Sequence, residues 1–131
     1  MNPKIISIYS GAGGIDLGFH KLGFDIVYAS DIWDIACETL KMNFDNTEVV
    51  CDSISDINFI DLQKKYEKID GLIGGPPCPP FSKSRFYRKE KNRGIEDEDG
   101  YMTLMQYVRS IKELKPKYFL FENVHGFIYK P

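Results

Sequence analysis

The sequence KIISIYSGAGG, residues 4–14, places an apolar β-branched run directly before a serine and three closely spaced glycines. Such a run is typical of a buried strand. Glycines at a strand-to-helix turn let the backbone approach a ligand closely, and the start of the next helix offers unpaired amides. This stretch therefore predicts a strand, a ligand-binding turn and a helix, although a tight turn with no ligand explains the glycines alone equally well.

The rest of the chain continues this alternation of short β-branched or aromatic runs with segments of helical period. The pattern predicts an α/β fold, a three-layer sandwich with a mostly parallel sheet. The predicted strands are 4–9, 25–30, 48–51, 69–74 and 117–122, and the predicted helices are 14–22, 32–43, 58–67 and 101–114. In the last helix the spacing predicts one buried face, with Lys112 and Glu113 turned outward; that face consists of Met102, Met105, Tyr107, Val108, Ile111 and Leu114.

Composition limits the class of protein. The 131 residues are 43% hydrophobic and 27% charged, which is typical of one soluble domain. No apolar run approaches the roughly 20 residues that cross a membrane. Three cysteines without a CxxC pair or a secretory leader predict an intracellular protein, cytoplasmic or nucleoid-associated, with no metal site. We expect Cys37 and Cys51 to be buried as small apolar side chains.

The third cysteine stands in a different context. It lies in GGPPCPPFS, residues 74–82, where a predicted buried strand meets two glycines and four prolines. This sequence ends the strand abruptly and limits the following backbone, which presents the Cys78 thiol at the end of a strand. Burial is the commoner fate of a free cysteine, but a thiol in this place is positioned as a nucleophile.

Two acids follow predicted strands in the first half of the chain. Asp31 lies 20 positions beyond Gly11, where an acid in a βαβ unit binds the hydroxyls of a ribose. Asp52 is placed to meet the base of the same nucleoside. For both acids the alternative is a simple helix cap. Asp16 stands where a dinucleotide fingerprint requires its third glycine, which disfavours a nicotinamide cofactor.

A third acid follows the last predicted strand, in FLFENV, residues 119–124. If the fourth and fifth strands are neighbours, Glu122 and Cys78 emerge side by side at the carboxyl edge of the sheet. That edge is where open α/β sheets bind ligands. The alternative for Glu122 is a surface salt bridge.

Five segments together resemble one known family, the cytosine-5 DNA methyltransferases. YSGAGG resembles its FxGxGG motif, SDIW its ribose motif, CDSI its adenine-side motif, GGPPCPPFS its nucleophile motif and FENV its glutamate motif. The resemblance runs from about residue 4 to 127 and implies a Rossmann-like, S-adenosylmethionine-dependent methyltransferase fold. The cofactor contacts that it implies are Tyr9, Ser10, Gly11, Gly13, Gly14, Asp31, Ile32, Asp52, Ile54, Pro76 and Leu104.

The resemblance also implies the chemistry. The Cys78 thiolate adds to carbon 6 of cytosine, Glu122 hydrogen-bonds ring nitrogen 3, and Asn123 fixes the glutamate loop. In duplex DNA the target cytosine must first be flipped out of the helix. A basic segment after the nucleophile is suited to DNA phosphates, through Ser82, Lys83, Arg85 and Arg88. A solvated loop is its equally weighted alternative.

The chain also departs from the family pattern. Pro79 stands where the family has glutamine, and Asp31 where glutamate is commoner. Residues 1–131 match a partial catalytic domain, the first five strands, without the target recognition domain and the C-terminal motifs. We therefore expect a partner chain carrying that half, or self-association, in a restriction-modification setting. A tRNA cytosine-5 methyltransferase and a non-catalytic cofactor-binding subunit are the alternatives.

Overall fold

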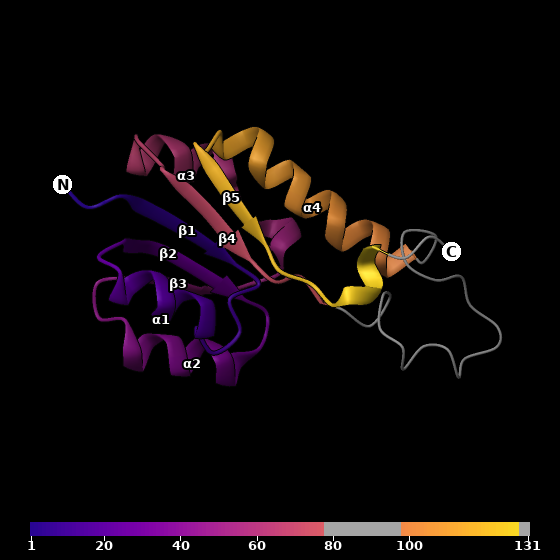
Figure 1. Ribbon diagram of the computed structural model, residues 1–131, viewed down its shortest axis with the longest axis horizontal. Coiled ribbons are helices and arrows are strands. Elements are labelled where there is room, and N and C mark those ends of the chain that lie inside the picture. Colours follow the sequence, from indigo (N-terminus) through magenta and orange to yellow (C-terminus); the bar gives the residue numbers. More distant parts are fainter. Residues whose placement is uncertain (78–97, 129–131) are drawn as a thin grey trace.

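The computed structural model describes residues 1–77 and 98–128 and confirms the α/β architecture. The described strands form one sheet in the order β3-β2-β1-β4-β5, and every neighbouring pair is parallel. The strands are β1 (Lys4–Ile8), β2 (Asp25–Asp31), β3 (Glu48–Cys51), β4 (Gly71–Gly74) and β5 (Tyr118–Phe121). Helices α1 (Gly14–Lys21) and α2 (Asp34–Asn43) cover one face, and α3 (Phe59–Tyr66) and α4 (Glu98–Leu114) cover the other (Figure 1).

The predicted elements all exist, and their ends differ by a few residues. β1 ends at Ile8, because Tyr9 has a φ of 51°, in the left-handed region, and turns the chain out of the strand. β4 and β5 are shorter than predicted by one or two residues at their ends. α4 begins at Glu98, three residues before the predicted start, and α2 begins two residues late, at Asp34.

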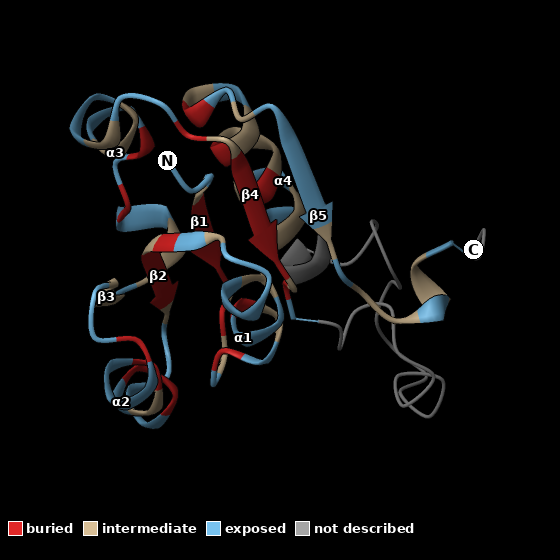
Figure 2. Ribbon diagram, turned by 60° about the vertical axis from the view of Figure 1, so that its left-hand side comes forward, coloured by how far each residue is buried: buried red, intermediate tan, exposed pale blue. Residues whose placement is uncertain are grey.

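Alternating side chains of the strands form two cores, one on each face of the sheet. Ile6, Ile8 and Leu72 pack towards α3 and α4, whereas Ile5 and Ile73 pack towards α1 and α2. Figure 2 shows β4 buried along its length, and β1 is buried from Ile5 to Ile8. Burial on both faces explains why these strands read as continuous apolar runs.

The predicted buried face of α4 was partly wrong. Tyr107 and Leu114 are buried, as expected, but Met102 and Met105 are 50% and 39% exposed. At about 100° per residue, positions five and two before Tyr107 fall on the far side of the helix. The buried face instead includes Ser110, three residues after Tyr107, which is fully buried.

Of the two cysteines expected to be buried, Cys37 is buried and Cys51 is only partly so. Cys51 ends β3, an edge strand of the described sheet, so one side of it is uncovered. Its Sγ donates to Asp34 Oδ1 at 3.2 Å. Within the described ranges, no helix is long and apolar enough to cross a membrane.

Gly74 provides a test of the packing between β1 and β4. A Cβ built on this residue would collide with the backbone oxygen of Ile8 and lie 3.1 Å from the Tyr107 ring. Because strand backbone cannot move aside, Gly74→Ala should lower the free energy of unfolding by about 2 kcal/mol. Chemical denaturation measures this change.

Gly18→Ala is the matched control. Gly18 is exposed on α1, and a Cβ there meets no atom within 4 Å. Alanine is the better helix former by about 1 kcal/mol, so this variant should be stabilised. Equal stability of the two variants would contradict the packing described for Gly74.

Candidate active site

A cavity of about 400 Å³ lies at the carboxyl edge of the sheet. The strand order reverses between β1 and β4, and open α/β sheets bind ligands at that point. All walls of the cavity but one come from the carboxyl ends of β1 to β4 and the segments that follow them, and the remaining wall comes from α4. The lining residues are Tyr9, Gly11, Ser30, Asp31, Ile32, Asp52, Ser53, Ile54, Gly75, Pro77 and Thr103.

Asp31 is fixed by two backbone amides. Its Oδ2 accepts a hydrogen bond from Gly11 N at 2.8 Å, and its Oδ1 accepts one from Trp33 N at 2.9 Å. α2 starts at Asp34 with Trp33 as its N-cap residue, so the helix-cap alternative for Asp31 was wrong. Each carboxylate oxygen keeps a free lone pair, so the group can still accept bonds from two ligand hydroxyls.

The glycine turn is hydrogen-bonded to the end of β2, and its glycines contact two different regions, the cavity and the end of α2. Ser10 N donates to Ser30 O at 3.0 Å, and Gly13 N donates to Ser10 O at 3.0 Å. Gly11 has a φ of 55°, and a Cβ there would meet nothing within 4 Å, so its open side belongs to the cavity. Gly13, with a φ of 89°, instead packs closely against Leu40 and Phe44. Gly11 thus lets a ligand approach, while Gly13 lets α2 approach.

Tyr9 joins this turn to α4. Its hydroxyl donates to Thr103 O at 3.1 Å. Burial raises the pKa of Tyr9 to about 12, and the positive charge of Arg109 only partly offsets that effect. The hydroxyl therefore remains a hydrogen-bond donor at neutral pH.

Asp52 and the two residues after it form the wall beyond β3. The helical turn that follows, η1 (Ile54–Asp56), has Ser53 at its N-cap position, so the cap alternative for Asp52 was wrong. Asp52 is exposed, and it lines the cavity together with Ser53 and Ile54. Its carboxylate is thus available to a ligand.

Glu122 and Asn123 lie against the glycine–proline segment that follows β4. β4 and β5 are neighbours, and Glu122 N donates to Gly74 O at 3.0 Å. Glu122 Oε2 lies 2.7 Å from the point where a Cβ on Gly75 would stand, so the glycine makes room for the carboxyl. Asn123 Nδ2 donates to Pro76 O at 3.3 Å. None of the ion pairs between described residues involves Glu122.

Some predicted site residues lie away from the cavity or outside the described residues. Ser10 is buried, with its hydroxyl 2.7 Å from that of Ser7. The predicted contacts that do not line the cavity are Ser10, Gly13, Gly14, Pro76 and Leu104. The predicted residues outside the described ranges are Cys78, Ser82, Lys83, Arg85 and Arg88, together with Pro79. For all of these the functional role stays a prediction.

Five lining residues were missed from the sequence. Each lies next to a residue that was predicted, so the signal was their position in the sequence beside a predicted contact rather than their type. They are Ser30, Ser53, Gly75, Pro77 and Thr103. Thr103 lies beside Leu104, which was expected to make the contact.

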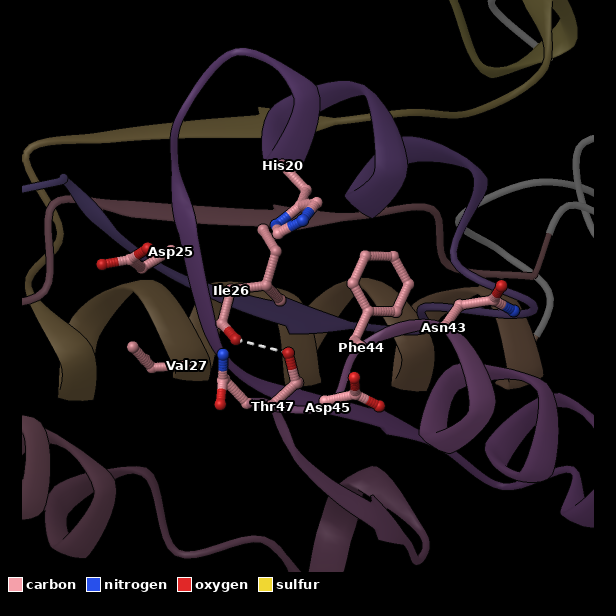
Figure 3. A pocket seen from close by; sticks show the side chains of 9 residues that line it. His20, Asp25, Ile26, Val27, Asn43, Phe44, Asp45 and Thr47 are labelled. Atoms are coloured by element: carbon pink, nitrogen blue, oxygen red, sulfur yellow. Dashed lines mark hydrogen bonds between the residues drawn. The ribbon is translucent and has the colours of Figure 1, made fainter.

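A second cavity, of about 380 Å³, lies near the start of β2 and the end of α2 (Figure 3). Thr47 Oγ1 donates to Ile26 O at 2.6 Å on its wall, and His20 contacts the Phe44 ring. None of the predicted site residues lines it. The carboxyl-edge cavity is therefore the candidate active site.

The fold and this site together define a Rossmann-like α/β domain of the methyltransferase type. The chain belongs to the C-5 cytosine-specific DNA methylase family, whose sequence profile matches residues 3–131.

Two curated relatives and one solved structure support the assignment. The Type II methyltransferase M.NgoPII of Neisseria gonorrhoeae is 41% identical over 128 residues, which cover 97% of this chain and 35% of that protein. M.AquIA of Picosynechococcus sp. is 38% identical over 132 residues, covering 98% and 51%. The crystal structure of a prophage-encoded E. coli protein, described as a DNA modification methyltransferase, superposes with a TM-score of 0.78 at 31% identity and covers 98% and 34%. The chain thus spans about a third to a half of the length of these proteins.

Proposed function

We propose that this chain carries the cofactor and nucleophile sites of an enzyme that transfers a methyl group from S-adenosylmethionine to carbon 5 of cytosine in DNA. The observation that carries the proposal is the position of Glu122 against Gly75, at the start of the segment that leads to Cys78. An acid beside a nucleophile segment, next to a nucleoside-sized cavity, matches what attack on a cytosine ring requires.

The cavity fits the cofactor. Asp31 offers a carboxylate already oriented by Gly11 and Trp33, which suits a ribose diol. Ile32 and Ile54 offer apolar walls for a flat ring, and Asp52 offers an acceptor for its exocyclic amine. When bound, S-adenosylmethionine supplies a methyl group from its sulfonium.

The residues of the chain perform the remaining chemistry. The Cys78 thiolate adds to carbon 6 of the flipped cytosine, and the electron pair of the 5,6 double bond then makes carbon 5 nucleophilic. Glu122 hydrogen-bonds ring nitrogen 3 and stabilises the charge that develops during the addition. After carbon 5 takes the methyl group, its proton leaves to a base and the thiolate is expelled, which restores the double bond. Asn123 holds the glutamate loop to Pro76.

Nucleic acid would meet the basic segment after Cys78. Ser82, Lys83, Arg85 and Arg88 lie within eleven positions of the nucleophile, and cations of this kind bind phosphates. A DNA substrate also implies a cytoplasmic or nucleoid-associated protein.

Further polypeptide is proposed to cover β5. This edge strand exposes Tyr118, Phe119 and Leu120, with Phe119 56% exposed (Figure 2). An exposed apolar edge strand is a ready site for pairing. The remainder of the methylase, on the same or a separate chain, is the proposed occupant, and a second copy is the alternative.

Tritium transfer from labelled S-adenosylmethionine tests the function. The chain, alone and with a C-terminal half of a relative, is incubated with duplex DNA or with tRNA. We expect labelled 5-methylcytosine in DNA and none with Cys78→Ala. A 5-fluorocytosine duplex should trap a covalent adduct in the active preparation. Label in tRNA alone, or transfer by Cys78→Ala, would overturn the proposal.

A further inference from the structure

Arg109 connects α4 to the wall of the cavity beyond β3, although it does not line the cavity. Its guanidinium donates to two backbone carbonyls that bracket η1, from Nη2 to Ile54 O at 2.7 Å and from Nη1 to Ile57 O at 3.1 Å. Residues 54 and 57 are 55 and 52 positions away in the sequence. A single side chain thus holds both ends of this short turn.

Few hydrogen bonds hold the turn itself: Asp56 N donates to Ser53 O at 2.9 Å, and the Ser53 and Ser55 hydroxyls lie 2.8 Å apart. η1 is one turn of 3-10 helix, no side chain caps its start, and its Ile57 N–Ile54 O bond is long, at 3.4 Å. Short turns of this kind leave carbonyls without partners inside the helix. Arg109 supplies a donor to Ile57 O and adds a second, shorter bond to Ile54 O, and its planar fork can serve both acceptors at once.

The guanidinium itself is firmly positioned. Arg109 Nε donates to Gln106 Oε1 at 2.7 Å, and Nη1 lies 3.2 Å from Glu113 Oε2. The guanidinium carbon lies 4.7 Å from the centroid of the Phe59 ring, and Phe59 is fully buried. Through Arg109, the turn is therefore held in a fixed position relative to the core between α3 and α4.

The first residue of this turn and the residues just before it form part of the cavity wall. Ser53 and Ile54 line the cavity, and Asp52 directly precedes them. A small displacement of η1 would move the Asp52 carboxylate and the Ile54 side chain together.

We propose that Arg109 is a positioning residue for recognition of the adenine ring of the cofactor, acting through η1 on Asp52 and Ile54. The inference rests on the proposed function and extends it to a residue that contacts neither cofactor nor substrate. The adenine amine donates a hydrogen bond, and the Asp52 carboxylate only accepts. A hypoxanthine ring presents a carbonyl at the same place, so a correctly positioned Asp52 rejects it.

The test compares S-adenosylhomocysteine with its deaminated analogue S-inosylhomocysteine. Trp33 is the single tryptophan of the chain and lies beside Asp31, so its fluorescence reports binding. We expect the unmodified protein to prefer the adenosyl compound, and Arg109→Met to lower that preference about tenfold, the loss expected for one misplaced charged hydrogen bond. Arg109→Lys has a single ammonium group in place of the planar guanidinium, so it should recover only part of the preference that Arg109→Met loses.

The ratio of the two affinities separates positioning from folding. A variant that is merely less well folded binds both compounds more weakly by the same factor and keeps the ratio. Glu113→Gln is the control, because it removes the ion pair and keeps both carbonyl bonds; its ratio should match that of the unmodified protein. An unchanged ratio in Arg109→Met and Arg109→Lys would overturn the inference. Absence of binding of either compound by the unmodified chain would instead count against the proposed function.

Discussion

Asp31→Asn should weaken the binding of S-adenosylhomocysteine about 100-fold. The carboxylate is expected to accept bonds from both ribose hydroxyls, and bonds to a charged group contribute about 1.5–3 kcal/mol each. An asparagine side chain also turns an NH₂ group towards Gly11 N or Trp33 N, both of which now donate to the carboxylate. Two donors facing each other would loosen the glycine turn. Calorimetric titration measures the loss.

Asp34→Asn is the matched control for this prediction. Asp34 lies three residues further along the chain, at the start of α2, is exposed and contacts Cys51 rather than the cavity. It changes the net charge by the same amount, so long-range attraction is affected equally. Affinity should remain within about threefold of the unmodified value, as expected for a surface substitution. Equal losses in the two variants would show that charge alone, not the bonds of Asp31, is responsible.

Glu122→Gln should lower methyl transfer about 10²–10³-fold, the usual cost of losing one group that stabilises charge in the transition state. Glutamine has nearly the same shape, so its packing against Gly75 and the backbone bond to Gly74 O should survive. The amide of glutamine is a far weaker acid than a carboxyl group, so it cannot pass a proton to the attacked ring. The rate is measured in the preparation that transfers tritium to DNA.

Cofactor affinity supplies the control for Glu122. The side chain is not among the residues that line the cavity, so S-adenosylhomocysteine should bind Glu122→Gln as it binds the unmodified protein. A fall in rate without a fall in affinity assigns the residue to the chemical step. Turnover at the unmodified rate would remove Glu122 from the proposed mechanism.

The alternation of strands and helices was predictable because each element has its own pattern of apolar residues in the local sequence. β1 and β4 are covered on both faces of the sheet, so their consecutive side chains are buried: Ile5, Ile6 and Ile8 in β1, and Leu72 and Ile73 in β4. Such strands are apolar runs that can be recognised from the local sequence alone. The wrong residues on α4 had a local cause as well, because Met102 and Met105 are apolar but do not share the angular position of Tyr107. Cys51 was misjudged because its exposure depends on which strand forms the edge.

Residue types and their order along the chain thus determined the fold class, the glycine turn, the acids at 31, 52 and 122 and the thiol at 78. Only the tertiary structure decided what the groups within the described residues touch. Asp31 is 20 positions from the amide of Gly11, Asn123 is 47 from Pro76 O and Arg109 is 55 from Ile54 O. The physical reason is that periodicity acts over a few residues, whereas these contacts arise when the sheet order brings strand ends together.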